Sequence, residues 1–417
     1  MSGIAVYFSD CFNVDQDIIE EYGAVNISLI NDLPLFIDPF LLFNSENPDY
    51  QAIHTEMIKY LQFLHAQAQI TPMLSSGMRQ AWFHFSEVKQ TWLGFSQSGN
   101  VGRGMGAEFA DGLYKGLTSI FKDFSKTTIT KSPHMEKLCL ISPNVGRDKI
   151  SDFTTNFAKK YLLEYTQQFA RDNIDEQYCR NVTVNRVSFN WNTHTWQSGT
   201  FYLPYCNGDF VLLTPKEMLT RDDTFINRSD MLRNIEQISF AIPDDALRFQ
   251  LNQYFGEILK KSKKLNKTEK DQYAEMFIRE HPELIDYYLK YKEDNQEEAT
   301  SVSKENVRDV QFMFNTQIQQ LIEILGNTTA FYQTSPDAHE EAKKRVLFLK
   351  HVIEDQEGYR LFYQHDGNPI KRESDLQVIY RLVWYGTTLD VNREVNNGRG
   401  PVDYKISFGK KNSTLVE

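Results

Sequence analysis

The sequence is poor in cysteine, and its cysteines form no recognisable site. There are four in 417 residues, and no two of them have the Cys-x-x-Cys spacing typical of zinc sites and redox disulfides. The sequence therefore indicates neither a zinc site nor a disulfide framework. We interpret all four as isolated buried thiols in a reducing cytoplasm, at Cys11, Cys139, Cys179 and Cys206.

Long apolar runs are also missing. The longest apolar stretch, Pro34–Phe43, is interrupted by Asp38 and is too short to cross a bilayer. The first residues, MSGIAVYFSDCFNVDQ, show neither the basic start nor the apolar stretch of a signal peptide. We therefore expect a cytoplasmic protein with no membrane segment.

An excess of positive charge, which proteins that coat nucleic acids need, is absent too. The net charge is −11, from 56 acidic and 45 basic residues. This balance argues against non-specific binding to nucleic acid. It does not exclude a nucleic-acid enzyme, because such an enzyme can confine positive potential to one groove and cluster carboxylates around metal ions.

The remaining composition is that of a folded protein: 41% of the residues are hydrophobic, and 29 Phe and 21 Tyr favour well-filled cores. The length predicts several domains, and the fold class we expect is mixed α/β. Residues 1–300 are expected to form a mixed α/β sensor or regulatory region, with a sub-boundary near residue 130. Residues 301–360 are expected to form a helical connector. Residues 361–417 are expected to begin a C-terminal α/β core.

Apolar spacing predicts individual elements within these regions. Helices are expected from Ile53 to Ala68 and from Ala338 to Ile353. A third helix carries aromatic residues at four-residue steps from Phe153 to Phe169, which we expect to pack in the core. Ser151 or Asp152 is its candidate N-cap. The strand candidates are KLCLI, VTVNRVSFNW, TFYLPY and FVLLTP. VNISLI and PLFIDPFLLF are expected to be either strands or buried runs.

A cluster of polar residues marks a candidate site in the N-terminal part. His134, Glu136, Asp148 and Asp152 lie between a predicted strand and a predicted helix. Histidine with carboxylates can bind metal, and helix N-termini attract anions. Asp152 is also explained as a helix cap and Asp148 as a turn residue, which is the more ordinary interpretation, and the site stays open as the alternative. The glycine-rich segment 99–106 lacks the ending of a phosphate-binding P-loop and is more typical of a surface loop.

The final segment predicts a helix followed by a hairpin. The helix is expected from Glu373 to Trp384, and DVNREV is a short strand candidate. In VDYKISF, apolar and polar residues alternate, so that Asp403 and Lys405 share one face. After the GKKNS turn, TLVE begins the return strand and ends at Glu417.

Carboxylates on such a hairpin suit phosphodiester chemistry. Cleavage needs a divalent ion that activates water and neutralises charge, and Mg²⁺ prefers carboxylate oxygens. Asp403 and Glu417 stand on the two strands and are the candidate catalytic and metal-binding residues. Glu373 and Glu394 are supporting candidates.

The order of helix Glu, GRGPVD and a hairpin leading to LVE resembles the PD-(D/E)XK nuclease superfamily, which has the restriction-endonuclease-like fold. The resemblance covers residues 365–417. It implies that Asp403 and Glu417 hold Mg²⁺ or Mn²⁺. The family's Lys, which orients the attacking water, would fall two residues after Glu417. We therefore expect little or no cleavage by this chain alone, and activity in a longer parent protein.

The function implied by this resemblance is hydrolysis of DNA by metal-activated water, with the N-terminal region sensing or regulating. A large module joined to such a nuclease is typical of bacterial effectors against phage or foreign DNA. The expected partners are DNA as the substrate and either another protein or a second copy of the chain. The alternative hypothesis is a non-catalytic binding or assembly subunit of a defence or nucleic-acid-processing complex, which the acidic balance favours.

Overall fold

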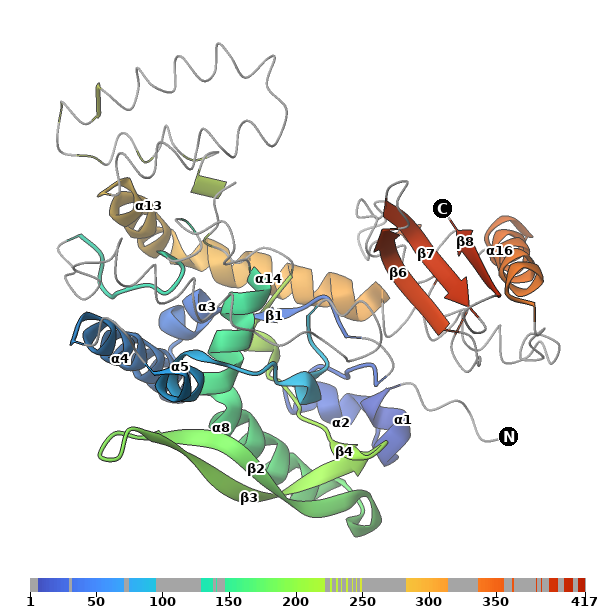
Figure 1. Cartoon of the computed structure of the whole chain (residues 1–417), viewed down its shortest axis with the longest axis horizontal. Helices are drawn as coiled ribbons and strands as arrows, with labels where there is room; N and C mark the ends of the chain where they lie inside the picture. Colours follow the sequence, from blue (N-terminus) through green and yellow to red (C-terminus); the bar gives the residue numbers. More distant parts are fainter. Residues whose placement is uncertain are drawn as a thin grey trace.

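The computed structural model of the chain is a mixed α/β protein, as predicted (Figure 1). Within the described residues, helices alternate with three small antiparallel sheets, β1–β5, β2–β3–β4 and β6–β7–β8. The structure describes residues 7–29, 32–70, 75–94, 129–137, 147–221, 283–313, 337–355, 390–396, 401–407 and 412–416, with single positions between 140 and 384. The glycine-rich segment 99–106 lies outside these residues.

Helix α8 (Arg147–Asn173) is the central element of the N-terminal part. Its side chains enter both large apolar clusters of the described residues: Phe153 lies in one cluster, and Leu162 and Phe169 lie in the other. The expectation that the aromatic stripe packs in the core is therefore confirmed at Phe153 and Phe169, both fully buried. In Figure 1, strands β2 and β3 cover the lower half of this helix.

The beginning of α8 differs from the prediction. Ser151 or Asp152 was expected to cap the helix, but the helix begins earlier, at Arg147. Ser151 is buried inside the helix, and its Oγ accepts the backbone N–H of Ile37 at 2.9 Å. The cap prediction is wrong because a serine that binds a distant strand looks the same in sequence as a serine that caps its own helix.

Both strands of the long hairpin beside α8 were predicted. Strands β2 (Cys179–Asn190) and β3 (Thr195–Cys206) pair antiparallel and contain VTVNRVSFNW and TFYLPY almost completely. Of FVLLTP, only Phe210 is in a strand, the short β4 (Asp209–Phe210). The register shifts between Val184 and Ser188, where Arg186 takes a φ of 55°.

The N-terminal segment is more helical than predicted. VNISLI forms only an isolated bridge, at Ser28, so its described residues are a buried run rather than a strand. PLFIDPFLLF is split: β1 (Phe36–Ile37) is followed by α3 (Pro39–Asn44), where the Asp38 carboxylate accepts the backbone N–H of Phe40. An Asp cap followed by Pro is a strong helix start, which overrides the apolar run. The other elements here are α1 (Phe8–Phe12), α2 (Gln16–Glu21), α4 (Pro48–Ile70), α5 (Ser76–Phe83) and η1 (Lys89–Thr91).

Helix α14 (Gln296–Gln311) joins the later part of the chain to this region. It packs against α3, η3 (Lys216–Met218) and β5 (Leu219–Thr220), and it buries Val307 and Val310. The boundary expected near residue 300 thus falls inside a continuous helix. Two shorter elements complete this region: η2 (Glu176–Tyr178) and α13 (Glu283–Asp294).

The C-terminal segment forms a small sheet with one helix beside it. Strands β6 (Asp390–Asn396), β7 (Pro401–Ser407) and β8 (Ser413–Val416) lie in sequence order, as the predicted hairpin requires. Helix α16 (Ala338–Asp355) packs against β7 and β8, and confirms the helix expected from Ala338 (Figure 1). Its buried Arg345 pairs with Glu341 and lies over the ring of Trp384.

None of the helices in the described ranges is both long enough and apolar enough to cross a membrane.

Candidate functional site

The C-terminal hairpin has the alternation that the sequence predicts. Tyr404 and Ile406 in β7 are only 3% and 0% exposed. The Tyr404 ring packs on Tyr380, with ring centroids 4.8 Å apart. In β8, Leu415 is 42% exposed, whereas its neighbour Val416 is half-buried. One face of the sheet is therefore packed at these positions, and Leu415 marks the other, open face.

Two of the predicted carboxylate residues stand on neighbouring strands. Asp403 lies in β7 and Glu394 in β6. In the β6–β7 ladder, Arg393 pairs with Tyr404 and Val395 pairs with Val402. Glu394 and Asp403 lie between these two pairs and therefore stand opposite each other. Directly opposite positions in an antiparallel ladder carry their side chains on the same face of the sheet.

The other two predicted residues, Glu373 and Glu417, lie outside the described residues. Glu417 follows Val416 in sequence, and Val416 pairs with Tyr404. In the part of the chain that is described, no group of three or more His, Cys, Asp or Glu residues is arranged to hold a metal ion. Metal binding at the hairpin therefore stays a prediction.

The N-terminal candidate centres on His134, whose side chain is fully buried. Its Nε2 lies 2.9 Å from Oε1 of Glu293 in α13, and its Nδ1 lies 3.9 Å from Oε2 of Glu136. Glu293 also accepts the backbone N–H of Lys131 through both oxygens, at 2.8 and 2.9 Å. These contacts fix the segment around His134 against α13.

Aromatic rings and ion pairs enclose this cluster. The ring centroids of Phe43 and His54 lie 4.9 and 6.2 Å from that of His134. Two ion pairs flank it: Lys137 with Asp286, and Lys292 with Asp230. The cluster is shielded from bulk solvent, because His134 and Glu136 are 0% exposed and His54 is 4% exposed.

Burial moves the pKa values of these groups. Burial raises the pKa of Glu136 to about 7, although the neighbouring His134 opposes the shift. Burial, followed by repulsion from His134, lowers the pKa of His54 to about 3. For Glu293, burial also favours the neutral form, but the hydrogen bonds from His134 and Lys131 outweigh it and lower the pKa.

The structure therefore brings two of the four predicted residues, His134 and Glu136, together. Asp152 lies within α8, where its backbone carbonyl accepts the side-chain amide of Asn156, and Asp148 lies in the first turn of that helix. KLCLI, predicted as a strand, is helical at its described residues Lys137 and Leu140.

The sequence does not indicate that Glu293 and His54 belong to this cluster. Glu293 is 159 positions from His134, and no local pattern connects the two. The buried polar atoms without a hydrogen bond in the described part include both carboxylate oxygens of Glu136, Nδ1 of His134 and Nε2 of His54. Chemically, this cluster can hold or release a proton. It also joins the segment that contains His134 to α13.

Two family models match the chain. Residues 13–227 match a domain of unknown function, DUF8370, and residues 338–417 match another, DUF8371. Because the first match spans more than half of the chain, the protein belongs to the DUF8370 family. No curated protein and no solved structure is significantly similar to it. The two matched segments correspond to the part built around α8 and to the part built from α16 and the β6–β7–β8 sheet.

Proposed function

We propose that this protein is a Mg²⁺-dependent nuclease of the PD-(D/E)XK type that hydrolyses DNA in bacterial defence. The C-terminal segment would carry the catalytic centre in a restriction-endonuclease-like core, and the N-terminal part would sense or regulate. The main support for this proposal is that Glu394 and Asp403 stand opposite each other in the β6–β7 ladder, in the hairpin that contains GRGPVD.

The ladder geometry suits a metal site. Opposite residues in an antiparallel pair have Cβ atoms about 4.5–5.5 Å apart. Carboxylates at that spacing can share one Mg²⁺, which binds its oxygens at about 2.1 Å. If the β7–β8 ladder continues by one residue beyond the Tyr404–Val416 pair, Glu417 stands opposite Asp403. Three acidic positions on three adjacent strands would then converge on the open face of the sheet.

The donor set also fits the proposed ion. Carboxylate oxygens are hard ligands, and Mg²⁺ or Mn²⁺ held there supplies charge neutralisation and an activated water. Asp403 and Glu417 would hold the ion, and Glu394 would either bind it directly or orient a water ligand. Lys405, two positions after Asp403 in β7, would provide positive charge on the same face for a DNA phosphate.

The test is plasmid cleavage by the protein expressed from its complete gene, with Mg²⁺ or Mn²⁺. Asp403→Ala is expected to lower the cleavage rate by more than about 100-fold, the upper range for loss of an outer-shell partner of a metal. Asp390→Ala is the matched control, because Asp390 pairs with Ser407 at the far end of the same ladder. This variant should cleave at the normal rate.

Metal binding is measured in parallel, by calorimetric titration of Mn²⁺ into each variant. Loss of binding in Asp403→Ala but not in Asp390→Ala supports the proposal. Equal cleavage by the two variants would contradict the assignment of Asp403. A protein that binds DNA or another protein, but neither binds metal nor cuts, would be the non-catalytic subunit of the alternative hypothesis.

A further inference from the structure

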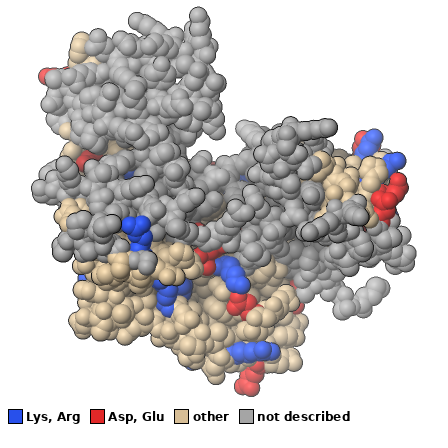
Figure 2. Space-filling model, in the orientation of Figure 1, with Lys and Arg blue, Asp and Glu red and all other residues tan. Residues whose placement is uncertain are grey.

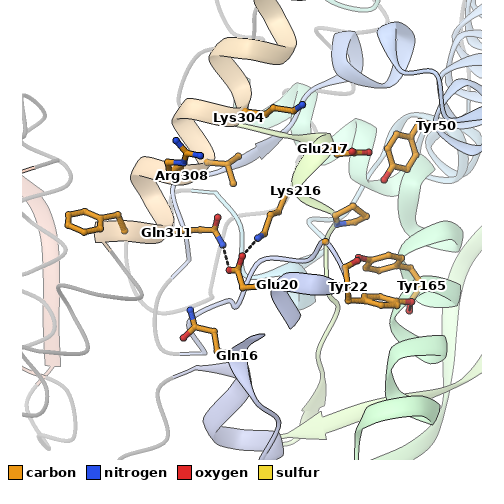
Figure 3. A pocket seen from close by; sticks show the side chains of 14 residues that line it. Gln16, Glu20, Tyr22, Tyr50, Tyr165, Lys216, Glu217, Lys304, Arg308 and Gln311 are labelled. Carbon is orange, nitrogen blue, oxygen red and sulfur yellow. Dashed lines mark hydrogen bonds and ion pairs between the residues drawn. The ribbon is translucent and has the colours of Figure 1, made fainter. Parts of the chain in front are cut away.

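A second feature, far in sequence from the hairpin, is a pocket of about 720 Å³ in the N-terminal part (Figure 3). Its walls come from α2 and the chain just after it, from α4, α8 and α14, and from η3. This volume lies in the range of small-molecule sites, about 300–1,000 Å³. The lining residues most relevant to ligand binding are Tyr22, Tyr165, Lys216, Lys304, Arg308 and Gln311.

One wall is aromatic and fixed in place. The rings of Tyr22 and Tyr165 pack against each other in Figure 3, with centroids 4.5 Å apart and planes tilted by 40°. Each hydroxyl donates to the backbone carbonyl of the other residue, at 2.9 and 2.7 Å. Because both hydroxyls are already bonded, the two rings form a rigid platform. Tyr50, labelled nearby in Figure 3, adds a third ring to the lining.

The opposite wall is cationic. Lys304 and Arg308 stand one turn apart on the same face of α14, and both are exposed. Neither forms an ion pair with any described residue. Lys216 differs, because it pairs with Glu20, which also accepts the Gln311 side-chain amide at 2.6 Å. Two cations therefore border the pocket without a carboxylate partner in the described part.

The balance of charge supports an anionic ligand at this wall. With Lys216 neutralised by Glu20, Glu217 remains as the acidic lining residue against Lys304 and Arg308. The face shown in Figure 2 carries described acidic and basic side chains close to one another, without a broad basic patch. Lys304 and Arg308 are thus the cationic lining residues available to an anionic ligand at this wall.

We propose that this pocket binds a nucleotide, either free or at the end of a nucleic-acid strand. Bases stack on aromatic rings, and the Tyr22–Tyr165 platform offers such a surface. Arg and Lys are the residues that bind phosphate, Arg through a bidentate fork. A simple inorganic anion would leave the aromatic wall unused, and an apolar ligand would leave both cations unpaired. The inference does not depend on the proposed nuclease activity.

The test is calorimetric binding of ATP, GTP, CTP and UTP to the full chain, with adenosine and tripolyphosphate as partial ligands. Lys304→Gln and Arg308→Gln are each expected to weaken nucleotide binding by about tenfold or more. Lys160→Gln is the matched control, because Lys160 is an exposed lysine of α8 outside the pocket. Unchanged thermal unfolding of all three variants shows that the fold is retained.

Each outcome bears on the proposal. Nucleotides that bind more tightly than both adenosine and tripolyphosphate support it, and a short single-stranded oligonucleotide tells a strand end from a free nucleotide. Tripolyphosphate that binds as tightly as ATP would reduce the pocket to a simple anion site and overturn the assignment. So would binding weaker than about 1 mM for every nucleotide and oligonucleotide, or binding that both pocket variants leave unchanged.

Discussion

Two buried side chains beside His134, those of Glu136 and His54, make the free energy of unfolding depend on pH in opposite directions. In the folded protein the pKa of Glu136 is raised to about 7, so the folded state keeps its proton more tightly than the unfolded state does. Its stabilising contribution is complete below the usual pKa near 4.5 and is lost as the pH rises through 7. For His54, with a folded pKa of about 3, stability is lost as the pH falls below 6.5.

Substitution of Glu136 separates its contribution to the pH dependence from that of His54. Glu136→Gln keeps the shape of the side chain but removes the cost of a buried charge. As the pH rises from 4.5 to 7, the variant should become more stable than the parent. The difference in free energy of unfolding should reach roughly 3 kcal/mol. Urea unfolding at several pH values measures it. Exposed Glu164→Gln serves as the control, and a difference that does not vary with pH would contradict the explanation.

At the scale of elements, α8 is the helix whose side chains enter both apolar clusters of the N-terminal part. Phe153 is fully buried, and its ring centroid lies 4.6 Å from that of Phe85 and 5.0 Å from that of Phe157. Phe153→Ala removes most of the ring and leaves a cavity beside the helix. We expect it to lower the free energy of unfolding by about 3–5 kcal/mol.

Chemical denaturation followed by tryptophan fluorescence checks this value. Phe153→Leu, which keeps most of the volume, is the comparison and should cost clearly less. A loss below about 1 kcal/mol for Phe153→Ala would show that α8 is not the packing centre.

Element types were largely predictable because they depend on local periodicity. The helix from Phe153 and the strands in VDYKISF and VTVNRVSFNW carry clear patterns, and all three form. Two predictions failed at polar residues that had more than one use. Ser151 was assigned to a helix cap and binds Ile37 instead, and Asp38 begins a helix inside an apolar run.

At the scale of the whole molecule, the C-terminal sheet packs apart from the two large apolar clusters. Neither cluster contains a described residue after Met313. The buried residues of the C-terminal segment, such as Ile406 and Tyr404, lie against their own sheet and helix. Damage to this packing should therefore stay local.

Ile406→Ala tests this separation. We expect a local loss of about 2–5 kcal/mol, seen by hydrogen exchange and mass spectrometry as faster exchange in α16 and β7. Exchange in α8 and nucleotide binding at the pocket should not change. Leu415→Ala, at an exposed position of the same sheet, is the control. Faster exchange in α8 as well would show that the two parts unfold together.

The sequence by itself determined the mixed α/β class, the long helices α4, α8 and α16, most strands of the two larger sheets, and the inward face of β7. It also indicated four candidate site residues, Asp403, Glu417, Glu373 and Glu394. Tertiary structure decided what local patterns do not encode. It joined His134 to Glu293 across 159 positions and assembled the pocket from five segments of the chain. It also placed Glu394 and Asp403 at one level. The physical reason is that periodicity records which face of an element is buried, whereas partners distant in sequence are selected only when those faces pack.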